Sequence, residues 1–339
     1  MVKRGYFSRR IVSTILTTAL ATQLHSATAA PTTASAQQEV NRLRTQAATK
    51  FEAANETKIK IGMLQKETSV LKVKELKAQN ELDAASNTLS RMAIDQYKSD
   101  GFSQGFGLLF SRDPSKYLTD ASILEMVGKK YSSSIRKFAS AQQRLEASQL
   151  VVGDKTALLQ AQQKRLNAEV LSARAALTKA EKILSSMKKE DRTRLARAEK
   201  ARENKILTSS KKYASSYKGD NTRGSIALKY ALRQVGDIYV WAAAGPTRWD
   251  CSGLTLRSFQ QAGVSLPHSS RIQINYGKSV SYKSLKPGDL LFFGKPISHV
   301  SMYMGKGKMV QAPRPGKRVE VVNFTLRFGS KPFVGARRL

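Results

Sequence analysis

The 339-residue sequence predicts an α+β protein, in which a long antiparallel α-helical hairpin precedes a compact domain with a small antiparallel sheet. Three observations predict this class. The region before residue 208 is rich in Ala, Leu, Gln, Glu, Lys and Arg, and it repeats apolar residues every seven positions. A break containing Gly and Pro divides that region in two. Beyond residue 224, Gly and Pro separate short apolar runs that are typical of strands.

Residues 1–36 have the organisation of a signal peptide. Basic residues open the segment, residues 11–24 are mildly apolar, and two Ala-x-Ala sites follow, which would permit cleavage after Ala29 or Ala36. The apolar run is too short and too often interrupted by polar residues to be a membrane-spanning helix. An amphipathic organelle-targeting segment is the alternative. We expect residues 1–36 to be removed and the mature protein to be secreted.

The charge of the chain predicts an anionic partner. Lys and Arg number 58 against 25 Asp and Glu, which gives a formal net charge of +33. Such a surplus attracts polyanions, and nucleic acid, anionic lipid and anionic cell-wall polymer are the candidates. Export favours the wall polymers, and the sequence has no base-stacking or helix-turn-helix signature. We therefore expect anionic wall polymers, and no nucleic acid, as partners outside the cell.

Residues 37–207 are expected to form the helical hairpin. An unbroken apolar column recurs every seven residues from Leu124 to Met187, and two shorter columns lie between residues 40 and 92. Sustained seven-residue repeats predict a left-handed coiled coil. Two ordinary helices of a globular bundle are the alternative, which we disfavour because no third element is available to cover them.

The tip of the hairpin is expected between residues 100 and 120, where three Gly and Pro114 end the first helix and reverse the chain. This segment also carries apolar residues, from Phe102 to Leu118, that the coiled-coil seam does not need. Exposed at the end of a long arm, they would form a docking surface. A small local core that closes the tip is the alternative, and the two can coexist.

Residues 208–224 (TSSKKYASSYKGDNTRG) are expected to be a flexible linker, because they are rich in Ser, Lys and Gly and have no apolar periodicity. Residues 225–339 then form the compact α+β domain. Its strand-like runs lie at residues 290–293, 300–304 and 319–322.

The single cysteine, Cys251, is predicted to be a nucleophile. It directly precedes a helix-like stretch that ends at Gly263, and a thiol at a helix N-terminus has a lowered pKa. A buried structural cysteine would usually stand in an apolar run, whereas Asp250 and Ser252 flank this one. With one cysteine no intrachain disulfide can form.

His299 is predicted to be the base that a thiol nucleophile needs. Of the three histidines, His25 falls in the expected signal peptide and His268 in a loop or helix cap. His299 opens an alternating strand, which would hold it rigidly. A turn at residues 305–307 would bring the next strand alongside and place Gln311 beside His299, where it can orient the imidazole.

Five segments together resemble the NlpC family of papain-like cysteine peptidases, which are bacterial cell-wall endopeptidases. They are Tyr239-Val-Trp, Asp250-Cys-Ser-Gly-Leu, Pro287-Gly-Asp-Leu-Leu-Phe-Phe, His299-Val-Ser-Met-Tyr-Met-Gly and Met309-Val-Gln-Ala-Pro. Order and spacing both match, over residues 225–339. The resemblance implies a helix that presents the Cys against a small antiparallel sheet that presents the His.

The resemblance also implies a Cys–His–polar triad of Cys251, His299 and Gln311. The third residue of the family is often His or Glu, so Gln311 departs from it in supplying no charge. No metal or other cofactor is expected, because the chain has no HExxH motif and no cluster of Cys and His ligands.

By the same resemblance, Tyr239 lies near the thiol, and Asp250 and Ser252 help to bind the amine of a peptidoglycan stem peptide. The bond cleaved would join D-Glu to the diamino acid of that peptide. Residues 242–245 read Ala-Ala-Ala-Gly where the family often has Gly-Gly, which would narrow the approach to the cleft. The alternatives are a non-catalytic scaffold or activator that binds wall peptide, and an amidase or acyltransferase on the same fold.

The helical region resembles the coiled-coil region of division-associated hydrolases of the PcsB and RipC kind, on the segment Gly107-Leu-Leu-Phe-Ser-Arg-Asp-Pro-Ser-Lys-Tyr-Leu118. This resemblance implies docking on a membrane complex of the FtsEX type through residues near Phe102 to Leu118, and a role in cell separation or wall remodelling. We expect the hairpin to restrain the catalytic domain, which requires direct contact with the cleft because a flexible linker fixes no single pose. Tethering alone is the alternative.

Overall fold

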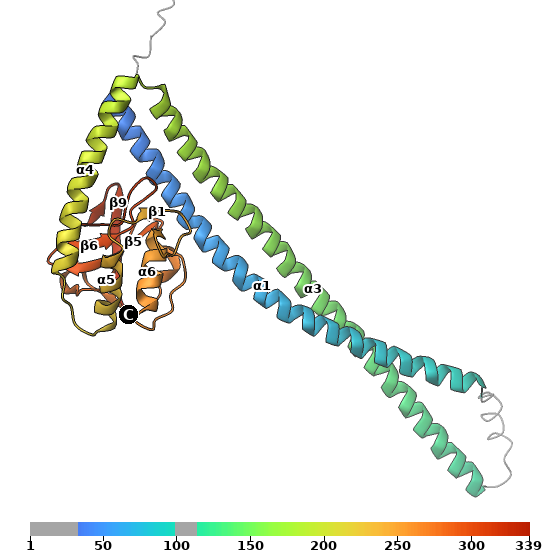
Figure 1. Cartoon of the computed structure of the whole chain (residues 1–339). Coiled ribbons are helices and arrows are strands. Elements are labelled where there is room, and N and C mark those ends of the chain that lie inside the picture. Colours follow the sequence, from blue (N-terminus) through green and yellow to red (C-terminus); the bar gives the residue numbers. More distant parts are fainter. Residues whose placement is uncertain (1–32, 99–113) are drawn as a thin grey trace, which may run out of the picture.

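A computed structural model describes residues 33–98 and 114–339 and arranges them as long helices followed by a compact α+β domain (Figure 1). Residues 1–32 of the expected signal peptide, and residues 100–113 of the tip expected over residues 100–120, lie outside the described residues. None of the helices in the described part has an apolar stretch of the length that a membrane crossing requires.

The first two helices form the predicted hairpin. Helix α1 (Thr33–Lys98) and helix α3 (Pro114–Ser186) pack against each other along much of their length (Figure 1). The seven-residue columns supply the buried residues of this contact, which include Val40, Ala47, Ala54 and Ile61 of α1 and Leu145, Val152, Ala173 and Ala180 of α3. Small Ala side chains at these positions allow the two helices to approach closely.

A third helix corrects the expected domain organisation. After α3 ends at Ser186, helix α4 (Lys189–Ser216) runs back along the compact domain (Figure 1). The expectation of a linker over residues 208–224 is therefore wrong as far as Ser216. The reason is a tertiary contact, because fully buried Ser210 bonds both the N–H (2.8 Å) and the C=O (3.2 Å) of Val321 on strand β7. We disfavoured a globular helical bundle because no third element was available, and α4 shows that this premise is wrong.

The compact domain is built on a sheet in which all neighbours are antiparallel, in the order β3-β9-β4-β5-β6-β7, with β8 paired to β9. The strands are β3 (Lys278–Val280), β4 (Leu290–Phe293), β5 (His299–Gly305), β6 (Lys308–Gln311), β7 (Glu320–Asn323), β8 (Arg327–Phe328) and β9 (Lys331–Arg338). The shorter elements are α5 (Arg223–Arg233), β1 (Ile238–Tyr239), β2 (Arg248–Trp249), α6 (Cys251–Gln260), α7 (Ser270–Gln273) and the 3-10 turn η1 (Tyr282–Ser284). The three predicted strand-like runs all lie in or beside strands of this sheet.

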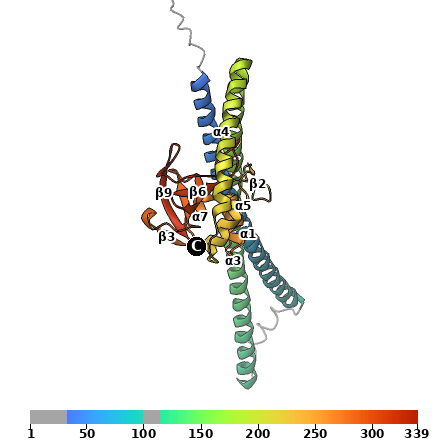
Figure 2. The ribbon, with the colours of Figure 1, turned by 60° about the vertical axis from the view of Figure 1, so that its left-hand side comes forward.

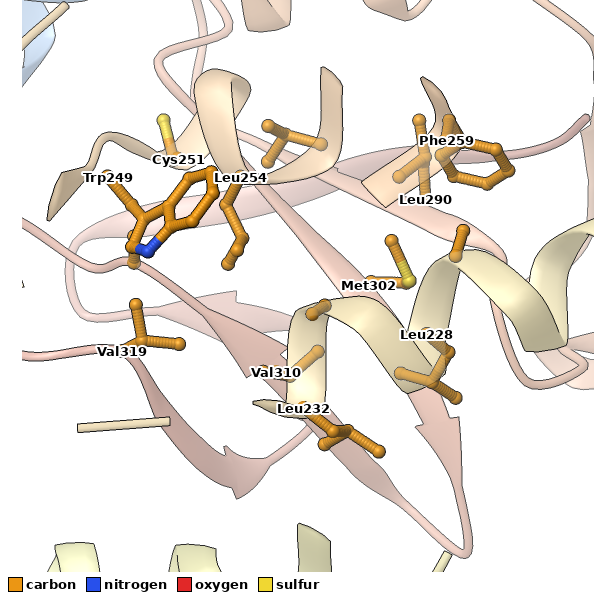
Figure 3. Packing of buried hydrophobic residues seen from close by; sticks show 14 of the residues in the cluster. Leu228, Leu232, Trp249, Cys251, Leu254, Phe259, Leu290, Met302, Val310 and Val319 are labelled. Atoms are coloured by element: carbon orange, nitrogen blue, oxygen red, sulfur yellow. The ribbon is translucent and has the colours of Figure 1, made fainter. Parts of the chain in front are cut away.

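The main core lies between the sheet and helices α5 and α6. Figure 3 shows Leu228 and Leu254 of these helices among Leu290, Met302 and Val310 of the strands. All four side chains of β4 are fully buried, because a second cluster of apolar residues covers the opposite face of that strand. The sheet and α6 are therefore held rigidly with respect to each other.

The compact domain lies in the angle between α4 and α1 (Figures 1 and 2). The ring of Trp241 stacks on Phe51 of α1 with centroids 4.4 Å apart, and Trp241 Nε1 donates to the Phe51 carbonyl at 3.0 Å. Lys317 of the domain bonds Glu199 of α4 at 2.7 Å. The domain thus touches both neighbouring helices directly.

Candidate active site

Cys251 is the first residue of α6 and is 3 % exposed. The carboxylate of Asp250 caps the helix by accepting the N–H of Gly253 at 2.6 Å. Only glycine fits at position 253, since an added Cβ would lie 2.2 Å from the Ala243 carbonyl oxygen and 2.9 Å from His268 Nε2. The small residues that follow the cysteine therefore let the chain pack closely around the helix start.

His299 begins β5, and its Nε2 lies 2.7 Å from Oε1 of Gln311 at the end of β6. The Gln311 amide donates through Nε2 to Glu320 of β7 at 3.0 Å, so its oxygen faces the histidine. Because an amide oxygen can only accept a hydrogen bond, the neutral His299 ring carries its proton on Nε2, and Nδ1 is free to accept a second proton. The strand pairing thus places Gln311 where the sequence predicted it.

Neighbouring groups hold the histidine and the thiol together. Phe328 stacks on the His299 ring with centroids 4.4 Å apart. The backbone N–H of Val300, the next residue, acts on the nearby Cys251 thiol to lower its pKa. The structure therefore brings the predicted nucleophile, base and orienting group into one site.

The three predicted substrate-binding residues surround the thiol. Tyr239 is buried, and its pKa is raised well above its usual value by burial and then by the charges of Cys251 and Asp250. Asp250 is fully buried and accepts hydrogen bonds from the Ala242 N–H at 2.8 Å and from Ser252 Oγ at 3.2 Å. All three side chains border one small polar region beside the sulfur.

His268 has a partner that the sequence did not reveal. Its Nε2 lies 2.8 and 2.9 Å from the two oxygens of Asp250. Burial alone would lower the pKa of His268, but the hydrogen bond and charge of Asp250 outweigh burial and raise it. His268 is therefore occupied in an ion pair, and it is not in the place of the base. Eighteen residues separate the partners, and no local pattern links them.

Helix α1 crosses the site and inserts a carboxylate into it. Glu52 is 1 % exposed, and its Oε1 accepts from Ser252 Oγ at 2.8 Å and from the Cys251 thiol at 3.4 Å. Its Oε2 accepts from the N–H and Oγ of Ser270 at 2.8 and 2.6 Å. One turn further, Asn55 Nδ2 donates to Asp250 at 3.1 Å. The cleft is thus filled by the protein's own helix.

This burial makes the thiol and the imidazole neutral. Burial, the Glu52 carboxylate and then Asp250 raise the pKa of Cys251 well above its usual value, and the Val300 N–H and Lys331 oppose them only in part. Burial, followed by the charge of Lys331, lowers the pKa of His299 to about 3. The prediction that the helix N-terminus lowers the thiol pKa is wrong in this state, because α1 excludes water and brings a carboxylate to the sulfur.

Comparison with known proteins assigns a family to the last third of the chain. Residues 236–338 match the NlpC/P60 family. A probable endopeptidase of Mycobacterium tuberculosis is 42% identical over 120 residues, which are 35% of this chain and 30% of that protein. The peptidoglycan endopeptidase RipA of Mycolicibacterium smegmatis is 38% identical over 116 residues, 29% of this chain and 23% of that protein. The chain thus matches less than a third of the length of each relative.

Among solved structures, NlpC2 of Trichomonas vaginalis is 30% identical over 34% of this chain and 46% of that chain, with a TM-score of 0.33. An NlpC/P60 family protein of Bacillus cereus is also 30% identical, over 34% of this chain and 42% of that chain, with a TM-score of 0.31.

Proposed function

We propose that this chain, whose residues 236–338 form an NlpC/P60 domain, is a peptidoglycan endopeptidase that its own helix α1 holds closed. The observation that carries the proposal is Cys251 at the start of α6, with the Val300 N–H acting on its thiol, and a preceding His299 whose Nε2 is fixed by Gln311. A neutral thiol and an imidazole with a free Nδ1 are the acid–base pair that thiol-catalysed hydrolysis of an amide requires.

The reaction begins when the pair is exposed to substrate and water. Cys251 transfers its proton to His299 Nδ1, and the thiolate attacks the carbonyl carbon of the scissile amide. The Cys251 N–H and a neighbouring donor hold the oxyanion, and His299 then gives its proton to the leaving amine. Water hydrolyses the resulting thioester with His299 as base, which restores the thiol. Gln311 and Glu320 keep the imidazole oriented throughout.

Helix α1 supports the assignment of the substrate side, because it imitates a bound peptide. Asn55 places an N–H on Asp250, where the proposal puts the amine of the stem peptide. Glu52 places a carboxylate oxygen 3.4 Å from the sulfur, where the proposal puts the scissile carbonyl. The substrate we propose is the stem peptide, cut between D-Glu and the diamino acid.

The contact between α1 and the cleft would also regulate the peptidase activity. Direct insertion of Glu52 into the cleft favours restraint over simple tethering, since the thiol is inaccessible until α1 moves. We propose that a membrane complex of the FtsEX type, binding near residues 102–118, shifts the hairpin and opens the site during cell separation or wall remodelling. The location would be extracellular or at the wall, where the net charge of +33 favours anionic polymers.

The proposal is tested by mass spectrometry of muropeptides digested with the full chain carrying Glu52→Ala, which opens the site. We expect products with a new N-terminus at the diamino acid, and none when Cys251→Ala is added. Cleavage at the sugar–peptide amide would instead identify an amidase, and an absence of new products would contradict the proposed activity.

A further inference from the structure

A basic groove of about 880 Å³ lies between α1 and the compact domain, on the His299 side of the thiol. Ser298, which precedes the histidine, and Phe328, which stacks on it, both line this groove. Within the described part of the chain, its lining contains five cationic side chains and no carboxylate. The cations are Arg42 and Lys50 of α1 and Lys295, Arg314 and Lys331 of the compact domain.

Lys331 is a buried cation without a counter-ion. It is 6 % exposed, and its Nζ donates to the Ser298 carbonyl at 3.0 Å. Among the residues that the structure describes, no carboxylate lies within ion-pair distance of it. Burial lowers the pKa of Lys331 to about 8, while the nearby Glu52 carboxylate opposes this effect, so the ammonium remains largely protonated at neutral pH. Burying a charge without a partner is unfavourable, which points to a ligand that completes the pair.

Arg314 is a second incomplete donor in the groove. Its Nη2 donates to Asn41 of α1 at 2.8 Å, whereas its Nη1 is buried and has no hydrogen-bond partner in the described structure. When α1 leaves the cleft, Asn41 leaves with it, and both nitrogens become available. An Arg that presents two N–H groups is suited to a carboxylate.

Arg42 and Lys50 move away with α1 when the cleft opens, whereas Lys331 and Arg314 stay on the compact domain. We propose that this domain side of the groove binds a free carboxylate on the leaving-amine side of the substrate, and that Lys331 and Arg314 select for it. The inference rests on the proposed function. Because His299 protonates the leaving amine, the residue that follows the scissile bond lies on the His299 side, where the groove begins. A diamino acid with a free side-chain carboxylate, such as diaminopimelate, complements the cations. Lysine would bring an ammonium into the same field, and an amidated side chain would bring no charge.

The test uses three synthetic stem peptides that differ only in the diamino acid: diaminopimelate, its side-chain amide, and lysine. The enzyme is the full chain carrying Glu52→Ala. We expect kcat/KM for the free carboxylate to exceed that for the amide by about tenfold or more, the usual effect of losing a charge-assisted hydrogen bond. Lys331→Met should bring this ratio close to one, Lys331→Arg should preserve it, and Lys283→Met, an exposed lysine outside the groove, should leave it unchanged.

A binding measurement separates this inference from the proposed function. The same peptides are titrated calorimetrically into the full chain carrying Glu52→Ala and Cys251→Ala, with and without Lys331→Met. If Kd follows the predicted ranking but the Glu52→Ala chain with Cys251 intact hydrolyses none of the peptides, the carboxylate site would be supported and the peptidase activity refuted. Hydrolysis with equal kcat/KM for all three peptides would overturn the groove proposal. The groove proposal would also be overturned if Lys331→Met lowered kcat/KM equally for every peptide and raised the pKa of Cys251, since Lys331 would then act on Cys251 alone.

Discussion

Substitution of Glu52 by Ala is the perturbation that the structure makes most informative. The carboxylate accepts hydrogen bonds from Ser252 Oγ, Ser270 Oγ and the Ser270 N–H, all at 2.8 Å or less. A hydrogen bond to a buried charged group typically contributes about 1.5–3 kcal/mol. These contacts exist only when α1 occupies the cleft, so the cost of losing them falls on the closed state alone. A loss of about 3 kcal/mol corresponds to a roughly hundredfold larger open population.

Two assays measure this change. The rate of stem-peptide hydrolysis by the full chain should rise by up to that factor, until the open form predominates. The rate at which iodoacetamide alkylates Cys251 at pH 7 should rise in parallel, because the thiol regains water and loses the nearby carboxylate that raises its pKa. The matched control is Glu56→Ala, which removes a half-buried ion pair with Arg271 one turn away and should act much less. Equal alkylation rates in the Glu52→Ala and unsubstituted chains would show that Glu52 does not hold the site closed.

Three further outcomes are expected. In the opened chain, Gln311→Ala should lower kcat by about tenfold to a hundredfold, because an orienting group contributes less than the base itself. Glu320→Gln should lower kcat by less, since Glu320 acts through Gln311. A larger loss of kcat in Glu320→Gln than in Gln311→Ala would contradict this order. The Asp250 pair raises the pKa of His268, so its stabilisation is complete below about pH 6.5 and is lost as pH rises through the folded pKa. The Tm difference between the unsubstituted chain and His268→Gln should therefore shrink from pH 6 to pH 9, and a constant difference would count against the pair. Binding to isolated wall sacculi should weaken steeply with salt, since exposed charges are screened within about 8 Å at physiological ionic strength.

Local patterns were sufficient to predict much of the fold. The heptad columns predicted which faces of α1 and α3 are buried, as at Val40 and Ala173. A cysteine before a helix-like stretch and a histidine opening an alternating strand predicted α6 and β5. The turn at residues 305–307 predicted that β6 returns beside β5, which is why Gln311 could be placed next to His299. Each of these inferences depends on residues close together in the sequence.

The features that the sequence did not reveal depend on distant contacts. Glu52 resembles any acidic residue of a long helix, and its place at the thiol arises only because α1 crosses residues about 200 positions away. Lys331 likewise resembles a surface lysine at the start of a strand. The helicity of residues 208–216 has the same origin, since Ser210 is ordered by Val321 and not by its own segment. The expectation of a lowered Cys251 pKa is wrong for the same reason, because the carboxylate that opposes it comes from distant Glu52.

A nucleophilic Cys251 in a cleft closed by α1 is tested most directly by labelling the chain with a chloromethyl ketone that carries the L-Ala-γ-D-Glu portion of the stem peptide. We expect one equivalent of label, located by mass spectrometry on Cys251, formed much faster in the Glu52→Ala chain than in the unsubstituted chain. Cys251→Ala should abolish the labelling. Labelling at another residue, or at the same rate in the closed and opened chains, would contradict a peptidase whose nucleophile is Cys251 and whose cleft is closed by α1.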